Sequence, residues 1–225
     1  MTDVRESLKI VRHKIEKACV KSKRDPKTVK LIGVTKGIDV NRILLAIEEG
    51  LTDIGENYVQ EAKKKAEMLK NWNVTWHMIG HIQTNKVKFI PDIFSYVHSV
   101  DRVKVLELLN SFGKPLKVLF QVNLSGEETK FGARTEDELF ELVKRAKEME
   151  NIEPIGLMTM PPYFEDPEMA RPYFRRLKEI LQRTNERFGL EMKELSMGMS
   201  NDFEVAIEEG ATMVRIGTAI FGERR

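Results

Sequence analysis

The sequence predicts an α/β protein folded as a closed barrel of eight parallel strands, each followed by a helical segment. Short apolar, β-branched runs alternate with helical patterns along all 225 residues, the connections are short, and eight such units occur. An open, doubly wound sheet is the alternative, but no GxGxxG motif follows the first strand, which weakens it. We therefore expect a (β/α)8 TIM barrel, with residues 1–225 forming one domain.

The first half of the chain contains four predicted strands and the helices between them. The strands are short β-branched runs, whereas the helices repeat apolar residues three or four positions apart. Strands are expected at residues 30–35, 52–55, 74–79 and 94–100. Helices are expected at residues 4–22, 40–49, 56–69 and 101–110, and a further one begins at 84–89. Asp39 and Asp101 are suited to cap two of these helices, and Gly50 to end one.

The second half repeats the pattern. Strands are expected at residues 116–123, 152–158, 194–197 and 212–216. Helices are expected at residues 135–149, 167–188 and 201–209, and residues 217–222 close the chain. Thr135 is a predicted N-cap, Ser200 or Asn201 is another, and Gly189 and Gly210 end helices.

Composition excludes several classes of protein. A net charge of +2 demands neither nucleic acid nor an anionic membrane, and the basic clusters 21–24 and 63–65 are interpreted as solvated helix faces. The single cysteine, Cys19, excludes an internal disulfide, fits a reducing compartment and is expected to pack against a neighbour. Residues 1–12 lack the apolar core of a signal peptide, and no apolar run approaches transmembrane length. A soluble cytoplasmic protein is therefore expected.

The most distinctive stretch is residues 31–37, an apolar, β-branched run that ends in Lys36 and Gly37. It predicts a buried strand with an amine at its carboxyl-terminal tip. A desolvated lysine loses its charge more easily, and a neutral amine is a nucleophile toward aldehydes. Lys36 is therefore a candidate Schiff-base lysine. The alternative is that the strand simply ends there and the side chain reaches water.

Two small, hydroxyl-bearing loops follow the last two strands, where barrels often build a phosphate site. The first contains Gly198, Ser200 and Asn201, and the second contains Gly217 and Thr218. Glycines allow close approach of the backbone, and the N–H groups of a helix start attract anions. Each loop alone could be a plain N-cap or turn, but both together favour a phosphate cradle.

Arg215 alternates with Val214 and Ile216, so its side chain faces the opposite way. It points either into the top of the barrel or against the helices. An inward arginine stays charged and needs an acceptor. That acceptor is either a ring nitrogen of a ligand or a strand-tip carboxylate such as Glu56.

Other predicted strand tips are polar as well. Asn57 follows the second strand, and three of the four histidines, His77, His81 and His98, lie at strand tips. Their spacings match no zinc pattern, so no metal site is predicted and hydrogen-bonded scaffold roles are expected.

Several segments carry a family resemblance that covers essentially the whole chain. They include VTK at 34–36, GENYVQE at 55–61, WHMIGHIQTNK at 76–86, LSMGMSND at 195–202 and RIGTAIFG at 215–222. The sequence resembles the YggS/PROSC family of pyridoxal phosphate homeostasis proteins, and the blocks at 76–86 and 196–202 are the specific ones.

The resemblance implies a type III pyridoxal phosphate fold, like the N-terminal domain of alanine racemase. It implies that Lys36 carries pyridoxal 5′-phosphate as an internal aldimine, that Arg215 faces the pyridine nitrogen and that Asn57 lies beside the ring. The phosphate would be held by Ser200, Gly217 and Thr218.

The resemblance also implies a carrier rather than an enzyme, with no catalytic residue assigned. An arginine at the pyridine nitrogen makes the ring a poorer electron sink. A racemase needs a second base from a second domain, and the chain ends at Arg225 without one. We therefore expect a monomer that buffers pyridoxal phosphate and passes it to apo-enzymes. A slow amino-acid racemase or decarboxylase, and a Schiff-base aldolase acting on sugar phosphates, are the alternatives.

Overall fold

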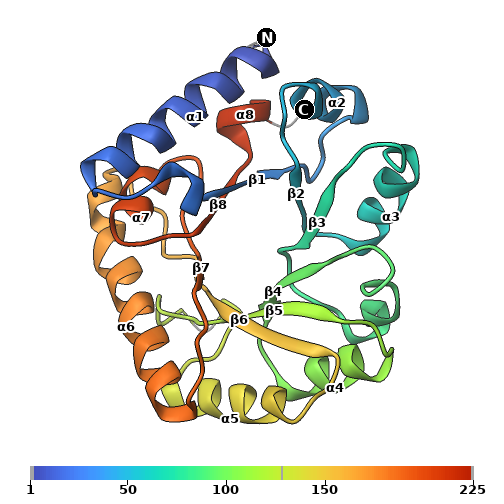
Figure 1. The fold of residues 1–225 in the computed structure, drawn as a ribbon, viewed down its shortest axis with the longest axis vertical. Coiled ribbons are helices and arrows are strands. Elements are labelled where there is room, and N and C mark those ends of the chain that lie inside the picture. The colour runs from blue at the N-terminus through green and yellow to red at the C-terminus, as the bar shows by residue number, and fades with distance from the viewer. Residues whose placement is uncertain (1–2, 128, 224–225) are drawn as a thin grey trace.

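Eight parallel strands close into a barrel in the order β1 to β8 in the computed structural model, which describes residues 3–127 and 129–223 (Figure 1). The strands are β1 (Lys30–Val34), β2 (Asp53–Glu56), β3 (Thr75–Met78), β4 (Tyr96–Val100), β5 (Leu116–Gln121), β6 (Ile152–Met158), β7 (Glu194–Ser196) and β8 (Met213–Ile216). The barrel closes where β1 pairs with β8, in a register from Lys30 opposite Met213 to Gly33 opposite Ile216. The predicted fold class is confirmed.

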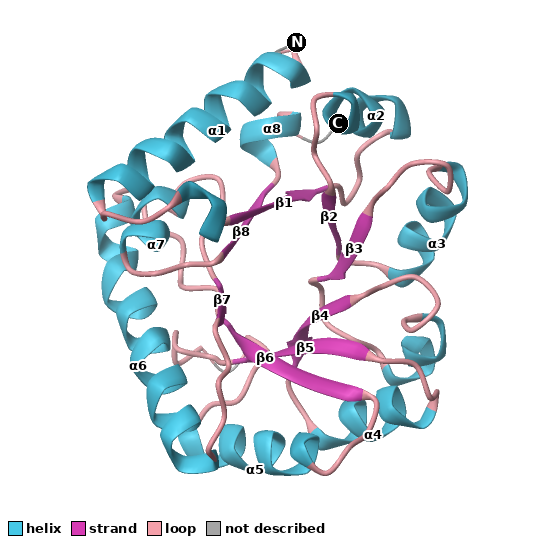
Figure 2. Cartoon of the chain, viewed as in Figure 1, coloured by secondary structure: helices cyan, strands magenta, loops and turns pink. Residues whose placement is uncertain are grey.

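Helices surround the ring of strands (Figure 2). They are α1 (Val4–Lys21), α2 (Val40–Glu48), α3 (Val59–Met68), α4 (Val103–Ser111), α5 (Glu136–Lys147), α6 (Arg171–Phe188), α7 (Phe203–Glu208) and α8 (Thr218–Phe221). The described residues also contain three 3₁₀ segments, namely η1 (Pro26–Thr28), η2 (Thr84–Phe89) and η3 (Pro167–Ala170). The helix expected to begin at 84–89 is therefore a 3₁₀ segment, and α8 was not predicted. None of the described helices is both long and apolar enough to cross a membrane.

The predicted caps hold at some helices and fail at others. The side chain of Asp39 accepts from the backbone N–H of Asn41, and that of Thr135 accepts from the N–H of Glu138, as expected. Asp101 does not cap α4, because that helix begins later and the Asp101 carboxylate pairs with Arg102.

Apolar side chains form two clusters, one inside the barrel and one between strands and helices. The interior cluster consists of Ile32, Leu119, Met158 and Met213. The outer cluster contains Val214 and Ile216 and the buried faces of the helices. Because side chains alternate along a strand, Arg215 shares the inward side of Met213.

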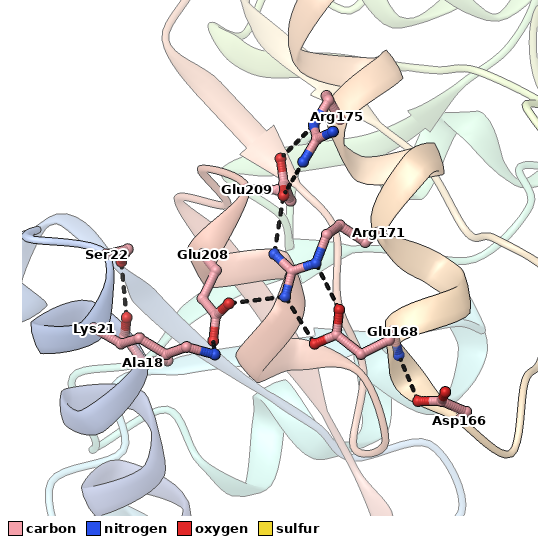
Figure 3. A network of polar contacts seen from close by, with 9 residues as sticks. All are labelled: Ala18, Lys21, Ser22, Asp166, Glu168, Arg171, Arg175, Glu208 and Glu209. Atoms are coloured by element: carbon pink, nitrogen blue, oxygen red, sulfur yellow. Dashed lines mark hydrogen bonds and ion pairs between the residues drawn. The ribbon is translucent and has the colours of Figure 1, made fainter.

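An ion-pair network on the outside of the barrel joins α1, α6 and α7 (Figure 3). Arg171 lies at its centre and contacts Glu168 at 2.7 Å, Glu208 at 2.8 Å and Glu209 at 2.9 Å. Glu208 also pairs with Lys21 of α1 at 2.7 Å. The network therefore ties the first helix to the last third of the barrel.

The basic cluster 21–24 is not simply a solvated face. Arg24 donates hydrogen bonds from Nη1 to the carbonyl oxygens of Ile207 and Ala211, at 2.7 and 2.8 Å. These carbonyls lie at the end of α7 and before β8, so Arg24 ties the segment after α1 to the connection between α7 and β8. The expectation for Cys19 is confirmed, since it is fully buried in the outer cluster.

Candidate functional site

Lys36 lies in the turn that directly follows β1, at the carboxyl-terminal end of the barrel. Its side chain is half-buried, whereas Thr35 before it is completely buried. Gly37 after it adopts a φ of 71°, a left-handed conformation that suits glycine. The strand ends at Val34, one residue before its predicted end at Thr35.

A second lysine, Lys65 of α3, holds the chain beside Lys36. Its Nζ donates to the carbonyl oxygen of Thr35 at 2.6 Å and to Oε1 of Glu56 and of Glu61, both at 2.7 Å. An ammonium has three protons, so all three are used. The Lys65 side chain is only 7% exposed, and the prediction that residues 63–65 form a solvated face is wrong at this position.

The same cluster fixes both sides of Lys36. Glu61 Oε1 accepts from the backbone N–H of Gly37 at 2.6 Å, and Glu56 Oε1 accepts from the hydroxyl of Thr35 at 2.7 Å. The two residues that flank Lys36 are therefore bonded to α3 through one buried cluster of charges. Nothing in the sequence pattern showed this, because Lys65 and Glu61 look like an ordinary exposed i, i+4 pair.

Glu56 is the most buried member of that cluster. Burial raises the pKa of its carboxyl group, and the hydrogen bonds from Lys65 and Thr35 oppose the rise. Among the described residues its second oxygen, Oε2, has no hydrogen-bond partner. Glu56 is also the last residue of β2, so α3 begins at Val59 rather than at residue 56 as predicted.

The two loops predicted to hold a phosphate do meet. Ser200 Oγ, after β7, accepts from the backbone N–H of Ala219, after β8, at 3.2 Å. Gly217 immediately precedes α8, and Thr218 is its first residue. A Cβ added at Gly217 would lie 3.4 Å from the Cβ of Val34, so a side chain there would crowd the end of β1.

Ser200 or Asn201 was expected to be a helix N-cap, but neither is. The helix α7 begins at Phe203 with Asp202 at the N-cap position, and Asp202 Oδ1 accepts from the N–H of Met199 at 2.6 Å. Burial raises the pKa of Asp202, which the Met199 hydrogen bond and the charge of Arg215 oppose. The Ser200 side chain is thereby left to face the β8 loop.

Arg215 points into the barrel and is 4% exposed. Its Nη1 donates to Ser196 Oγ at 2.5 Å, and its Nη2 donates to the carbonyl oxygen of Thr159 at 3.0 Å. Burial lowers the pKa of Arg215 to about 10, opposed by the charge of Asp202, so the guanidinium stays charged at neutral pH. Glu56, proposed as its acceptor, instead pairs with Lys65, and that alternative is wrong.

A cavity of about 520 Å³ opens at the carboxyl-terminal ends of β2, β3 and β5. Its lining includes Asn57, Met78, Gly80, His81, Lys86, Gln121, Phe131 and Met160. Of the predicted site residues, only Asn57 lines it. A Cβ added at Gly80 would lie 2.4 Å from the carbonyl oxygen of Asn57, so this wall requires glycine.

The three histidines expected at strand tips take different positions, and the expectation is wrong for His98, which is the third of the five residues of β4. His77 and His98 are completely buried inside the barrel, and their rings hydrogen-bond each other at 2.9 Å. His81 lies at the cavity and stacks on Phe131 with ring centroids 3.5 Å apart. Within the described part of the chain, no group of three or more His, Cys, Asp or Glu side chains is arranged to hold a metal ion.

Comparison with known proteins places this barrel in a family. The sequence profile of the alanine racemase N-terminal domain matches residues 7–225. A pyridoxal phosphate homeostasis protein of Aquifex aeolicus (strain VF5) is 45% identical over 224 residues, which cover 98% of each chain.

Solved structures agree with this placement. PipY of Synechococcus elongatus PCC7942, solved with PLP bound, is 30% identical and superposes with a TM-score of 0.82 over 93% of this chain and 100% of PipY. An alanine racemase of Clostridium difficile 630 is 15% identical with a TM-score of 0.75, covers 97% of this chain and 57% of its own, and shares the fold alone. The chain therefore belongs to the pyridoxal phosphate homeostasis protein family, whose barrel is that of the alanine racemase N-terminal domain.

Proposed function

We propose that this chain binds pyridoxal 5′-phosphate at the carboxyl-terminal end of its barrel and holds it on Lys36 as a Schiff base. The observation that carries the proposal is the lysine itself. Lys36 follows β1 at the barrel mouth, and both of its neighbours are anchored by the buried Lys65 cluster. An anchored backbone limits where the lysine amine can go, which favours a single geometry of attachment.

The other predicted residues offer donors that suit the rest of the cofactor. Among the described residues no hydrogen bond uses the hydroxyl protons of Ser200 and Thr218, so both are available to a phosphate. Arg215 carries five N–H protons and donates two of them, to Ser196 and Thr159. The remaining protons suit a ring nitrogen that acts as an acceptor, and Asn57 would lie beside the ring.

These residues favour storage of the cofactor over catalysis with it. Bound pyridoxal phosphate supplies an aldehyde and an electron-withdrawing ring. Arg215 has no acceptor atom, so it matches only an unprotonated ring nitrogen, and such a ring withdraws electrons weakly. Relatives of this chain are named homeostasis proteins. We infer an intracellular, monomeric protein that buffers the cofactor and delivers it to apo-enzymes.

The cavity beside Asn57 favours a second candidate, a slow amino-acid racemase or decarboxylase. A volume of about 520 Å³ at the barrel mouth has room for a small amine-bearing molecule. Incubation of purified protein with single amino acids, followed by chiral chromatography, separates the two functions. Turnover that disappears in Lys36→Ala would support the enzyme, and absence of turnover with a full cofactor load would support the carrier.

The cofactor proposal is tested by visible absorbance during titration with pyridoxal phosphate. We expect a yellow band that survives dialysis in the natural protein and in Lys64→Ala, whose lysine is exposed on α3. Lys36→Ala should lack that band. An unchanged band in Lys36→Ala would contradict the assignment of the lysine, and no band in the natural protein would contradict binding.

A further inference from the structure

Five polar side chains form a hydrogen-bonded row, the polar row, that crosses the interior of the barrel. Asp53 Oδ1 lies 2.9 Å from His77 Nε2, and His77 Nδ1 lies 2.9 Å from His98 Nε2. His98 Nδ1 lies 2.8 Å from Ser196 Oγ, which accepts from Arg215 Nη1 at 2.5 Å. Each residue comes from a different strand, namely β2, β3, β4, β7 and β8. The polar row exists only because the barrel closes.

The polar row joins the two ends of the barrel. Asp53 is the first residue of β2, at the amino-terminal end, where it pairs with Lys30 at 3.1 Å. Arg215 is the third residue of β8, near the carboxyl-terminal end that carries the proposed cofactor site. A negative charge at one end is thus linked to a positive charge at the other through three side chains that carry no charge when the histidines are neutral.

The hydrogen bonds can run in only one direction when both histidines are neutral. The Asp53 carboxylate accepts, so His77 must donate from Nε2 and accept at Nδ1. His98 must then donate from Nε2 to His77 and accept at Nδ1, and Ser196 must donate its hydroxyl proton to His98. Ser196 Oγ is left with lone pairs, and these accept from Arg215. Every donor points from Arg215 toward Asp53.

The surroundings keep the two imidazoles neutral. His77, His98 and Ser196 are completely buried. Burial lowers the pKa of His98 well below its usual value, and the neighbouring His77 and Arg215 lower it further. Burial also lowers the pKa of His77, which the hydrogen bond and charge of Asp53 oppose. Hydrogen bonds in such a row polarise one another in a low dielectric.

Other aromatic and charged side chains lie near the polar row. Tyr96 stacks on His77 with ring centroids 4.4 Å apart, and the ammonium groups of Lys30 and Lys117 lie 5.8 and 5.5 Å from the Tyr96 ring centroid. Asp202 acts on Arg215 through its charge. The positive charges therefore gather at the two ends, and the middle of the polar row contains only neutral donors and acceptors.

We propose that Asp53, His77, His98 and Ser196 form a positioning network that orients Arg215 toward the ring nitrogen of the cofactor and couples that contact to the opposite end of the barrel. The inference rests on the proposed function. Ser196 accepts from Nη1 of Arg215 and Thr159 accepts from Nη2, so these two contacts inside the barrel set the plane of the guanidinium. A change in what Arg215 contacts at the cofactor site must therefore change the strength and polarisation of the hydrogen bonds along the polar row, while their direction stays the same.

Nitrogen-15 NMR of the histidine side chains in the intact protein tests the coupling directly. We expect His77 and His98 to be Nε2–H tautomers, and both to shift when pyridoxal phosphate is added. His13, on the exposed face of α1, is the internal control and should not shift. If His77 and His98 stay unchanged while the visible band of the cofactor develops, the coupling is refuted and the proposed function stands. If no band develops, both fail.

Variants of His77 separate positioning from mere packing. His77→Gln keeps the polar row intact, because its amide donates to Asp53 and accepts from His98, whereas His77→Leu interrupts it. We expect His77→Leu to bind pyridoxal phosphate about fivefold more weakly, the equivalent of one neutral hydrogen bond, and His77→Gln to stay within about twofold of the natural protein. Ser196→Ala, which removes the direct anchor of Arg215, should also weaken binding about fivefold.

Equal affinities of His77→Leu and the natural protein would overturn the inference. Equal losses in His77→Leu and His77→Gln would also overturn it, since a packing defect would then explain both. If His77→Leu does not fold, Ser196→Ala and the NMR experiment decide the outcome.

Discussion

Replacing Lys65 by methionine should destabilise the protein strongly and in a pH-dependent way. The substitution keeps the length of the side chain and removes three hydrogen bonds, to Thr35, Glu56 and Glu61. Glu56 is 0% exposed and loses its only cationic partner among the described residues. A buried carboxylate without a partner either stays charged at great cost or takes up a proton.

Protonation sets the size of the effect. Bringing a carboxyl group with an ordinary pKa near 4.3 into its neutral form at pH 7 costs about 3.7 kcal/mol, since each pKa unit is about 1.36 kcal/mol. This agrees with the roughly 3–5 kcal/mol that removal of one partner from a buried ion pair costs. At pH 5 the same protonation costs only about 1 kcal/mol. Adding about 1 kcal/mol for the other lost hydrogen bonds gives a loss of about 4–5 kcal/mol at pH 7 and about 2 kcal/mol at pH 5.

Urea unfolding at the two pH values measures these losses. Glu56→Gln combined with Lys65→Met removes both charges, and we expect it to recover at least about 2 kcal/mol at pH 7 relative to the single variant. Lys64→Met, on the exposed side of the same helix, should change stability by no more than about 0.5 kcal/mol. A loss below about 1 kcal/mol in Lys65→Met, or a loss equal at both pH values, would refute the reasoning.

Two further predictions concern the interior and the cavity wall. The pKa of Asp53 is lowered to about 2, because burial, which raises it, is outweighed by the hydrogen bonds from His77 and Thr52 and by the charge of Lys30. The ionised Asp53 should therefore stabilise the folded protein by up to about 2.5 kcal/mol, fully above about pH 4 and less as the pH falls toward 2. Asp53→Asn should lack this part of the acid-unfolding curve. Identical acid-unfolding curves for the variant and the natural protein would contradict the prediction. Gly80→Ala should lower stability by about 2–4 kcal/mol and weaken cofactor binding, because its Cβ would clash with the carbonyl oxygen of Asn57 at 2.4 Å. Gly113→Ala is the control without a clash, since its added Cβ meets nothing within 4 Å, and it should cost only the roughly 1–2 kcal/mol of an alanine at a φ of 68°. Equal losses of stability, with equally weakened cofactor binding, would count against the clash.

The strands were predictable because each is a short apolar run between polar segments. Alternation also predicted that Arg215 faces away from Val214 and Ile216, but it left open which side is the inside of the barrel. The structure settles that choice, because Arg215 points into the barrel. Local patterns suffice for such predictions, since they depend only on neighbours in the sequence.

The ends of the helices and the partners of the buried charges were harder to predict. Asp101 has the chemistry of an N-cap but pairs with Arg102 instead. Ser200 was expected to begin a helix, yet its hydroxyl contacts the loop after β8. In both cases the hydrogen bond that decides the structure involves a side chain or backbone group whose position depends on the tertiary fold.

The buried polar contacts were missed for the same reason. Lys65 resembles its exposed neighbours in sequence, and only the packing of α3 on β1 and β2 buries it. His77 and His98 were expected to be scaffold groups, but their pairing requires β3 and β4 to lie side by side within a closed barrel. Contacts between residues distant in the sequence cannot be read from periodicity.

The most direct test of the central claim is to find the lysine that carries the cofactor. The natural protein would be loaded with pyridoxal phosphate, reduced with borohydride, digested and analysed by peptide mass spectrometry. We predict one dominant modified peptide, with the label on Lys36. A dominant label on Lys65 or Lys86, or a label spread evenly over surface lysines, would contradict the claim that Lys36 at the tip of β1 holds the cofactor.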